Sequence, residues 1–369
     1  MAQAVDRIAP EPQDPAGRWA RHPALTVAFH RLPQRARAVL SLSAPSWATP
    51  WRKPRVPEVV RTGPSIAVIG NCQARGAAEA MRLLAPNSPV RFIQMAWLKR
   101  EHGHVDNLAR TLHGFDHVFS QQFPSGLIPG GDIDALRALE PRLRLFPTLV
   151  FPAFHPDMVY AGRIADLSAL KLAPSPMGQY HSAIALAAHR VGLSIDRTVA
   201  LYREDVFARL GYLDLWESSV RDLLGSAAQI GFGLDREMAR WARRGDFMYV
   251  LNHPKAFVIG DIARRLLDES GLRPEPVEIE AYIGDELARD VVWPVYPPIA
   301  EAYGLTGSYL FKAKPRGKAF PRLYDLPGFV AASFAIYEGL SREALACQRV
   351  ESWLADPAIA GLFEAARRD

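Results

Sequence analysis

The stretch SIAVIGNCQARGAAEAMRLL, residues 65–84, decides the fold. Its first part is a short apolar run that predicts a buried strand over 65–70. Its second part, 74–84, carries apolar residues at helical spacing and predicts an amphipathic helix. Gly70 permits a tight turn between the strand and the helix. One of the two cysteines of the chain, Cys72, stands at this turn.

The alternation of strand and helix continues to about residue 150. Further strands are predicted at VRFIQM, HVFSQ and RLRLFPTLVF (90–95, 117–121 and 142–151), and helices at HVDNLARTLHGF and GDIDALRALE (104–115 and 131–140). Short strands that alternate with helices imply a mostly parallel sheet. We therefore expect an α/β fold of the SGNH or flavodoxin-like kind, with an open, mostly parallel sheet and helices on both of its faces.

Composition divides the chain into three parts. Residues 1–63 are rich in Pro, Gly and charge, which predicts a disordered basic arm and linker. Residues 64–325 hold the predicted α/β domain, and a helical insertion is expected at about 180–245, where strand signals are few. Residues 326–369 are expected to form a C-terminal helical segment.

The composition also excludes several classes of protein. Residues 1–60 hold nine Lys/Arg and four Asp/Glu, so the net charge of +5 resides in the arm and argues against a nucleic-acid surface across the domain. Two cysteines cannot form a disulfide framework and indicate a reducing compartment. No metal site, signal peptide or membrane span is expected, and we predict a cytoplasmic protein.

The position of Cys72 suggests chemistry. In open α/β sheets the ligand crevice lies at the carboxyl ends of the strands, where this turn belongs. A helix N-terminus favours negative charge, so we expect a lowered thiol pKa at Cys72 and amides that stabilise an oxyanion. The alternative is a small residue packed under the turn. Cys347, on a predicted helix, is interpreted as a packing residue.

Three other turns carry histidine and polar side chains. They are FPAFHPD (151–157), PMGQYHS (176–182) and LNHPK (251–255), which each lie beside a predicted strand or helix end. A single histidine is more often structural, but three such turns beside a cysteine turn indicate a Cys/His site. The candidate residues are His155, His181, His253, Gln179, Tyr180 and Asn252.

The motifs GNCQ, FHPD, GQYH and NHP, in this order, resemble the WcbI-like polysaccharide biosynthesis family over roughly residues 65–310. The resemblance implies a coenzyme A-binding acetyltransferase of bacterial capsule assembly. It implies that Cys72 is the reactive or thioester-contacting group, with Asn71 and Gln73 as polar neighbours in the site. His253, His181 and His155 are then the candidate bases.

The cysteine turn also resembles the first block of SGNH hydrolases, where a serine follows Gly-Asp after the first strand. Asn71 and Cys72 stand in the places of that Asp and Ser. The likeness favours His253 as the base, because it lies late in the chain after a strand, with His181 close behind. The Asp-x-x-His block of those enzymes has no match here, since Asn252 directly precedes the histidine.

The leading hypothesis is transfer of an acyl group from acyl-coenzyme A, such as acetyl-coenzyme A, to a sugar hydroxyl of a capsular or other surface polysaccharide or its precursor. Arg75 and the loop FKAKPRGK, with Lys312, Lys314 and Arg316, are candidates for binding the phosphates of coenzyme A. One alternative is an SGNH-like ester or thioester hydrolase with a cysteine nucleophile. Another is a glycan- or nucleotide-binding protein without catalysis. The acceptor sugar and the oligomeric state cannot be read from the sequence.

Overall fold

The four strands predicted up to residue 151 form one parallel sheet. The computed structural model describes residues 61–163, 171–315, 317 and 319–368, so the predicted arm falls almost entirely outside the described residues. The sheet order is β2-β1-β3-β4, and every neighbouring pair is parallel. Its strands are β1 (Ile66–Gly70), β2 (Val90–Gln94), β3 (His117–Ser120) and β4 (Leu143–Leu145).

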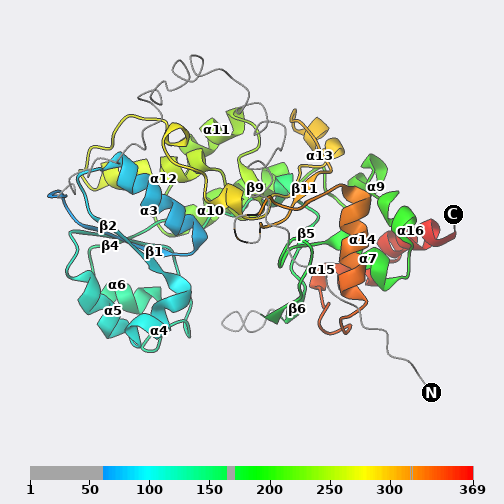
Figure 1. The fold of residues 1–369 in the computed structure, drawn as a ribbon, viewed down its shortest axis with the longest axis horizontal. Helices are drawn as coiled ribbons and strands as arrows, with labels where there is room; N and C mark the ends of the chain where they lie inside the picture. Colours follow the sequence, from blue (N-terminus) through cyan, green and yellow to red (C-terminus); the bar gives the residue numbers. More distant parts are fainter. Residues whose placement is uncertain (1–60, 164–170, 316, 318, 369) are drawn as a thin grey trace, which may run out of the picture. The chain divides into compact units, whose positions relative to one another are not determined.

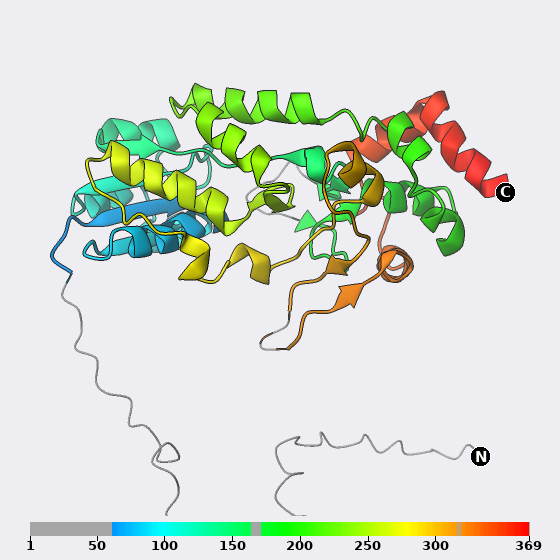
Figure 2. The same cartoon turned by 90° about the horizontal axis from the view of Figure 1, so that it is seen from above.

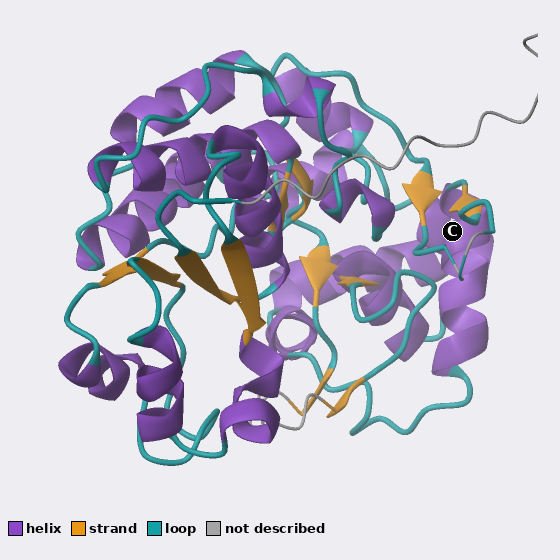
Figure 3. Cartoon of the chain, turned by 60° about the vertical axis from the view of Figure 1, so that its left-hand side comes forward, coloured by secondary structure: helices purple, strands orange, loops and turns teal. Residues whose placement is uncertain are grey.

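Helices cover both faces of this sheet (Figure 1 and Figure 3). Successive side chains of the central strand β1 point to opposite faces and join two separate hydrophobic clusters. Ile66 and Val68 pack with one set of helices, and Ala67 and Ile69 pack with the other. This confirms the predicted α/β fold. The first set includes α3 (Cys72–Leu84) and α12 (Ala256–Glu269), and the second includes α4 (Leu98–His102), α5 (Val105–Leu112) and α6 (Ile133–Leu139).

The rest of the described chain is mainly helical. The range predicted as a helical insertion contains α7 (Ala183–Arg190), α8 (Ile195–Val199), α9 (Glu204–Arg209), α10 (Trp216–Gln229) and α11 (Asp235–Arg243). The later helices are α13 (Pro297–Ala302), α14 (Leu326–Tyr337), α15 (Gln348–Ala355) and α16 (Pro357–Arg368). Cys347 precedes α15 and is buried, as its packing interpretation requires.

The segments between these helices contain short antiparallel strand pairs. They are β5 (Met158–Val159) with β8 (His181–Ser182), β6 (Gly162–Arg163) with β7 (Lys171–Leu172), β9 (Met248–Val250) with β10 (His253–Pro254), and β11 (Phe311–Lys312) with β12 (Leu323–Tyr324). Figure 2 shows β11 and β12 extending away from the helices. Single 3₁₀ turns lie at Met95–Trp97, Pro152–Phe154, Ile279–Ala281 and Leu287–Arg289.

The fourth strand is shorter than predicted, and this moves the turn that follows it. The strand ends at Leu145, although residues 142–151 were expected to be extended. Pro147 has no N–H to donate to a ladder, so pairing stops there. His155 therefore follows a 3₁₀ turn and does not lie at the end of a sheet strand. The strand just before the NHP motif, Met248–Val250, likewise pairs in the separate β9–β10 hairpin, outside the main sheet.

Helix α12 holds the β9–β10 hairpin against the cysteine turn. The helix follows the hairpin directly and packs along α3. A Cβ added to Gly76 in α3 would lie 3.3 Å from Ile259 of α12, so the two helices approach closely at this glycine. A chain segment some 180 residues from Cys72 is thereby brought beside it.

None of the helices in the described ranges combines the length and the apolar character that a membrane span needs.

Candidate functional site

The turn between β1 and α3 is fixed by hydrogen bonds. Asn71 is the N-cap of α3, and its side-chain oxygen accepts from the Gln73 N–H at 2.9 Å. The Asn71 N–H donates to Oε1 of Gln121, just after β3, at 2.9 Å. A Cβ on Gly70 would lie 2.4 Å from both Ala74 Cβ and the Gln121 oxygen, so glycine is required there. Cys72 consequently opens the helix.

The structure brings Cys72 and His253 together. Cys72 Sγ lies 3.6 Å from His253 Nε2, within hydrogen-bond reach for sulfur. Cys72 is exposed, whereas His253 is only 6% exposed. The other ring nitrogen of His253, Nδ1, is buried and has no hydrogen-bond partner in the described structure. The two side chains form a thiol–imidazole pair made of an exposed cysteine and a buried histidine.

Gln73 joins the segments that carry this pair. Its Nε2 donates to the carbonyl oxygens of Leu149 and Asn252, both at 2.8 Å. Its Oε1 accepts from the Leu149 N–H at 2.9 Å. The residue is 2% exposed. Gln73 was expected to face a ligand, but its amide is fully used inside the protein, so it acts as a positioning residue.

A chain of polar side chains lies on the other side of His253. The Tyr180 ring packs edge-on against the imidazole, with centroids 6.2 Å apart. The Tyr180 hydroxyl donates to Asn252 Oδ1 at 2.8 Å, and Asn252 Nδ2 donates to the Tyr160 hydroxyl at 3.1 Å. Tyr180 and Asn252 were predicted in the site, whereas Tyr160 was not. Nothing in the sequence around Tyr160 distinguishes it from a packing residue.

Burial keeps both members of the pair neutral. The amides of Cys72 and Gln73 favour the thiolate. Although Cys72 keeps an exposed surface, the protein atoms packed around it displace much of the water near its sulfur, and this desolvation outweighs the amides and raises the pKa of the Cys72 thiol. The prediction of a lowered thiol pKa is therefore wrong, because it counted the helix and not the surrounding protein atoms. Burial also lowers the pKa of His253. Neutral thiol and neutral imidazole are thus the resting forms.

The other two candidate histidines make different contacts. Both ring nitrogens of His181 are occupied, Nδ1 by the Tyr337 hydroxyl at 2.9 Å and Nε2 by the Ala173 carbonyl at 3.0 Å. His155 is buried, with Nε2 3.4 Å from the Met248 carbonyl, and burial lowers its pKa to about 4. Among the described residues neither contacts Cys72.

The basic residues proposed to bind phosphate differ in whether their charged groups already have partners inside the protein. Lys312 donates its ammonium group to the carbonyls of Ala288 and Asp290, which occupies it inside the protein. Lys314 pairs with the Asp290 carboxylate at 2.8 Å but is largely exposed. Asp290 acts to raise and Lys314 to lower the pKa of both Cys72 and His253, which places this ion pair near the site. Arg75 is exposed and donates to Gln94 at 2.8 Å. Gln179 is exposed, and Arg316 lies outside the described residues.

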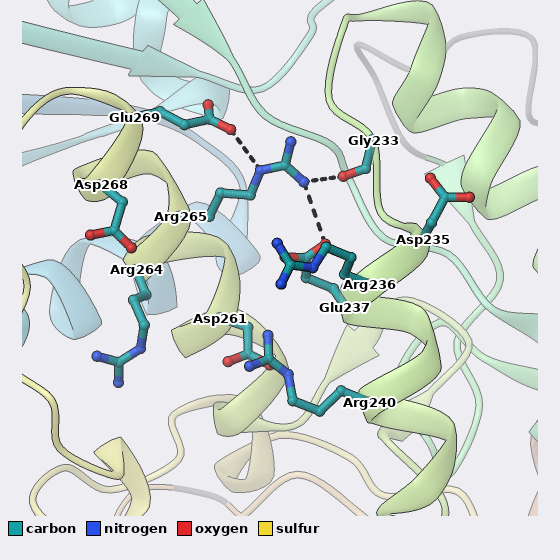
Figure 4. Close-up of a pocket in the computed structure, with 10 residues that line it drawn as sticks. All are labelled: Gly233, Asp235, Arg236, Glu237, Arg240, Asp261, Arg264, Arg265, Asp268 and Glu269. Atoms are coloured by element: carbon teal, nitrogen blue, oxygen red, sulfur yellow. Dashed lines mark hydrogen bonds and ion pairs between the residues drawn. The ribbon is translucent and has the colours of Figure 1, made fainter.

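A cavity of about 690 Å³ lies between α11 and α12 and contains none of the predicted site residues (Figure 4). Three of its acidic side chains pair with arginines: Glu237 and Glu269 with Arg265, and Asp261 with Arg240. We assign no function to this cavity. In the described ranges no group of three His, Cys, Asp or Glu side chains is placed to hold a metal ion.

Comparisons with known proteins indicate one family. The family model described as polysaccharide biosynthesis enzyme WcbI matches residues 65–275, more than half of the chain. A solved structure of WcbI superposes on this chain with a TM-score of 0.62. It is described as a novel polysaccharide biosynthesis enzyme, in its native form without a disulfide bond between coenzyme A and a cysteine. It is 14% identical, and the alignment covers 82% of this chain and 99% of that chain, a likeness that shows the fold. No curated protein matches the chain.

Proposed function

Since this chain belongs to the WcbI family of polysaccharide biosynthesis enzymes, we propose that it transfers an acyl group from acyl-coenzyme A to a saccharide hydroxyl. The acceptor would be a capsular or other surface polysaccharide, or its precursor. Acyl-coenzyme A is made in the cytoplasm, so the proposal places the reaction there, in keeping with a chain of only two cysteines.

The observation that carries this proposal is the 3.6 Å contact between Cys72 Sγ and His253 Nε2 at the start of α3. A nucleophile within reach of a base is the arrangement that acyl transfer needs. The description of the solved WcbI structure names coenzyme A together with a cysteine of that protein. That pairing supports a binding site in which the thiol end of coenzyme A lies beside Cys72.

The resting protonation states suggest how the transfer proceeds. As the Cys72 sulfur attacks the thioester carbonyl carbon, its proton moves to His253 and the carbonyl π electrons move to oxygen. When the oxyanion collapses, the carbon–sulfur bond to coenzyme A breaks, and the imidazolium returns its proton to the departing thiolate. The acceptor hydroxyl then attacks the acyl-cysteine carbonyl carbon while His253 takes its proton. When this second oxyanion collapses, the carbon–sulfur bond to Cys72 breaks, and the imidazolium returns the proton to the Cys72 thiolate, which leaves the acyl ester as product. Direct attack by the hydroxyl on acyl-coenzyme A uses the same base.

The amides at the start of α3 would hold the oxyanion. General base catalysis of this kind contributes about 10²–10⁴-fold, and an oxyanion donor about 10²–10³-fold. Among the basic candidates we assign phosphate binding to Arg75 and Lys314, because Lys312 is held by backbone carbonyls.

The test combines binding with turnover. Coenzyme A and acetyl-coenzyme A should raise the thermal midpoint of the wild-type protein, because they bind only the folded state. Turnover is measured by chromatography as the rate at which coenzyme A is released from acetyl-coenzyme A, with a panel of nucleotide sugars as acceptors. This rate should fall about 100-fold in Cys72→Ala and His253→Asn. His113→Asn, an exposed histidine outside the site, is the matched control.

Three results would contradict the proposal. The first is a thermal midpoint unmoved by millimolar coenzyme A species. The second is full turnover in Cys72→Ala and His253→Asn. The third is equally fast release of coenzyme A with and without every acceptor, which would favour the thioester hydrolase instead.

A further inference from the structure

We propose that the Tyr160 hydroxyl hydrogen-bonds to the carbonyl oxygen of the bound thioester, an inference that rests on the proposed function. No motif contains this residue, and it comes directly after β5. The hydrogen bonds around its hydroxyl group limit where the hydroxyl proton can point.

The Asn252 amide lies between two tyrosine hydroxyls, with its oxygen toward Tyr180 and its nitrogen toward Tyr160. An amide oxygen only accepts, so Tyr180 donates its one hydroxyl proton to Asn252 Oδ1 at 2.8 Å. Asn252 Nδ2 lies 3.1 Å from the Tyr160 hydroxyl and acts as the donor. The Tyr160 oxygen is therefore the acceptor in this bond, and its own proton is not used in it.

Tyr160 is also partly accessible to solvent. Tyr160 is half-buried, in contrast to Tyr180, which is 4% exposed and already donates to Asn252. The centroids of the two rings lie 5.4 Å apart and both hydroxyls bond the Asn252 amide, so the two hydroxyls are neighbours. A phenol O–H has two favoured in-plane positions. Because the Tyr160 oxygen accepts from Asn252, its own proton can turn to a substrate oxygen when a ligand is bound.

Tyr160 belongs to the environment of the reacting sulfur. Asn252, which bonds Tyr160, directly precedes His253, whose Nε2 contacts Cys72 Sγ at 3.6 Å. Burial raises the pKa of Tyr160, and a negative charge on Cys72 also acts to raise it, so the hydroxyl keeps its proton and remains a donor. A thioester carbonyl beside Cys72 needs such a donor, because its oxygen gains an electron pair when the sulfur or the acceptor hydroxyl attacks.

The test separates binding of the carbonyl from binding of coenzyme A. Two unreactive analogues are titrated calorimetrically into the wild-type protein and Tyr160→Phe. One is a ketone in which CH₂ replaces the thioester sulfur and the carbonyl is retained, and the other is S-ethyl-coenzyme A, which has no carbonyl. The dissociation constant of the ketone should rise about 5- to 10-fold in Tyr160→Phe, and that of the thioether should change less than twofold.

Turnover gives a second measure. Release of coenzyme A from acetyl-coenzyme A should fall about 100-fold in kcat in Tyr160→Phe, with KM changed little. Tyr303→Phe is the matched control, because it also removes one tyrosine hydroxyl, here one bonded to the Leu213 carbonyl at 3.3 Å. Equal ketone affinity in wild type and Tyr160→Phe, or equal loss for both analogues, would overturn the role of Tyr160 and leave the proposed function standing. A wild-type protein that binds neither analogue would overturn both.

Discussion

At the scale of single residues, the chemistry depends on a thiol that is neutral at rest. The helix N-terminus and burial act on Cys72 in opposite directions, and burial prevails. A neutral thiol becomes nucleophilic only when a base receives its proton, and His253 is the base within reach. Because burial lowers the pKa of His253, the imidazole is free to accept a proton at pH values below the ordinary value of 6.5.

A substitution at Asn71 can change the pKa of the Cys72 thiol while keeping the helix cap. Asn71→Asp keeps an oxygen for the Gln73 N–H but adds a negative charge beside Cys72, so the thiol pKa should rise further. We expect alkylation of Cys72 by iodoacetamide at pH 8 to slow roughly threefold, which corresponds to less than about 1 kcal/mol. Asn71→Ala, which removes the cap, should instead lower the free energy of unfolding by about 1 kcal/mol. An unchanged or faster alkylation in Asn71→Asp would contradict this reading.

At the scale of elements, Gln73 determines how the β9–β10 hairpin meets α3. In Gln73→Leu the Leu149 N–H and the carbonyls of Leu149 and Asn252 lose their partners. Each buried group left without a partner costs about 1–3 kcal/mol. We expect a fall of at least about 2 kcal/mol in urea unfolding, together with weaker protection of the hairpin amides in hydrogen exchange. Gln229→Leu, on the exposed surface of α10, serves as the control. Equal stability of the two variants would remove the positioning role of Gln73.

The elements also show what the sequence can predict. The strand, turn and helix around Cys72 follow from local periodicity, and the structure has them where expected. The end of β4 depends on a proline that interrupts a strand-like apolar run. The role of Gln73 depends on partners 76 and 179 residues away, which no local pattern encodes. The thiol pKa was mispredicted for the same reason, since burial is a property of the tertiary structure.

At the scale of the whole molecule, a buried carboxylate ties distant segments together. Asp157 is fully buried and accepts hydrogen bonds from the Ile184 N–H at 3.0 Å and from the hydroxyls of Tyr212 and Tyr296, both at 2.9 Å. These partners come from the start of α7, the segment after α9 and the start of α13. Burial raises the pKa of Asp157 to about 6.

This raised pKa makes stability depend on pH. Between the ordinary pKa of 3.8 and about 6 the folded protein keeps a proton that the unfolded chain has released. The contribution of Asp157 to the free energy of unfolding should therefore fall by about 2 kcal/mol as the pH rises through this window. Urea unfolding of wild type and Asp157→Asn, which cannot titrate, should show wild type losing stability relative to the variant from pH 4 to pH 6. Parallel profiles for the two proteins would contradict the prediction.

The central claim is that Cys72 lies in the coenzyme A site, and alkylation of its thiol tests this most directly. The wild-type protein is treated with iodoacetamide with and without desulfo-coenzyme A, which has no thiol of its own, and each cysteine is followed by peptide mass spectrometry. ATP is the control nucleotide, and buried Cys347 is the internal reference. We predict that saturating desulfo-coenzyme A slows alkylation of Cys72 at least tenfold, while ATP has little effect and Cys347 stays unmodified throughout. Alkylation of Cys72 at the same rate with millimolar desulfo-coenzyme A as without it would contradict the account.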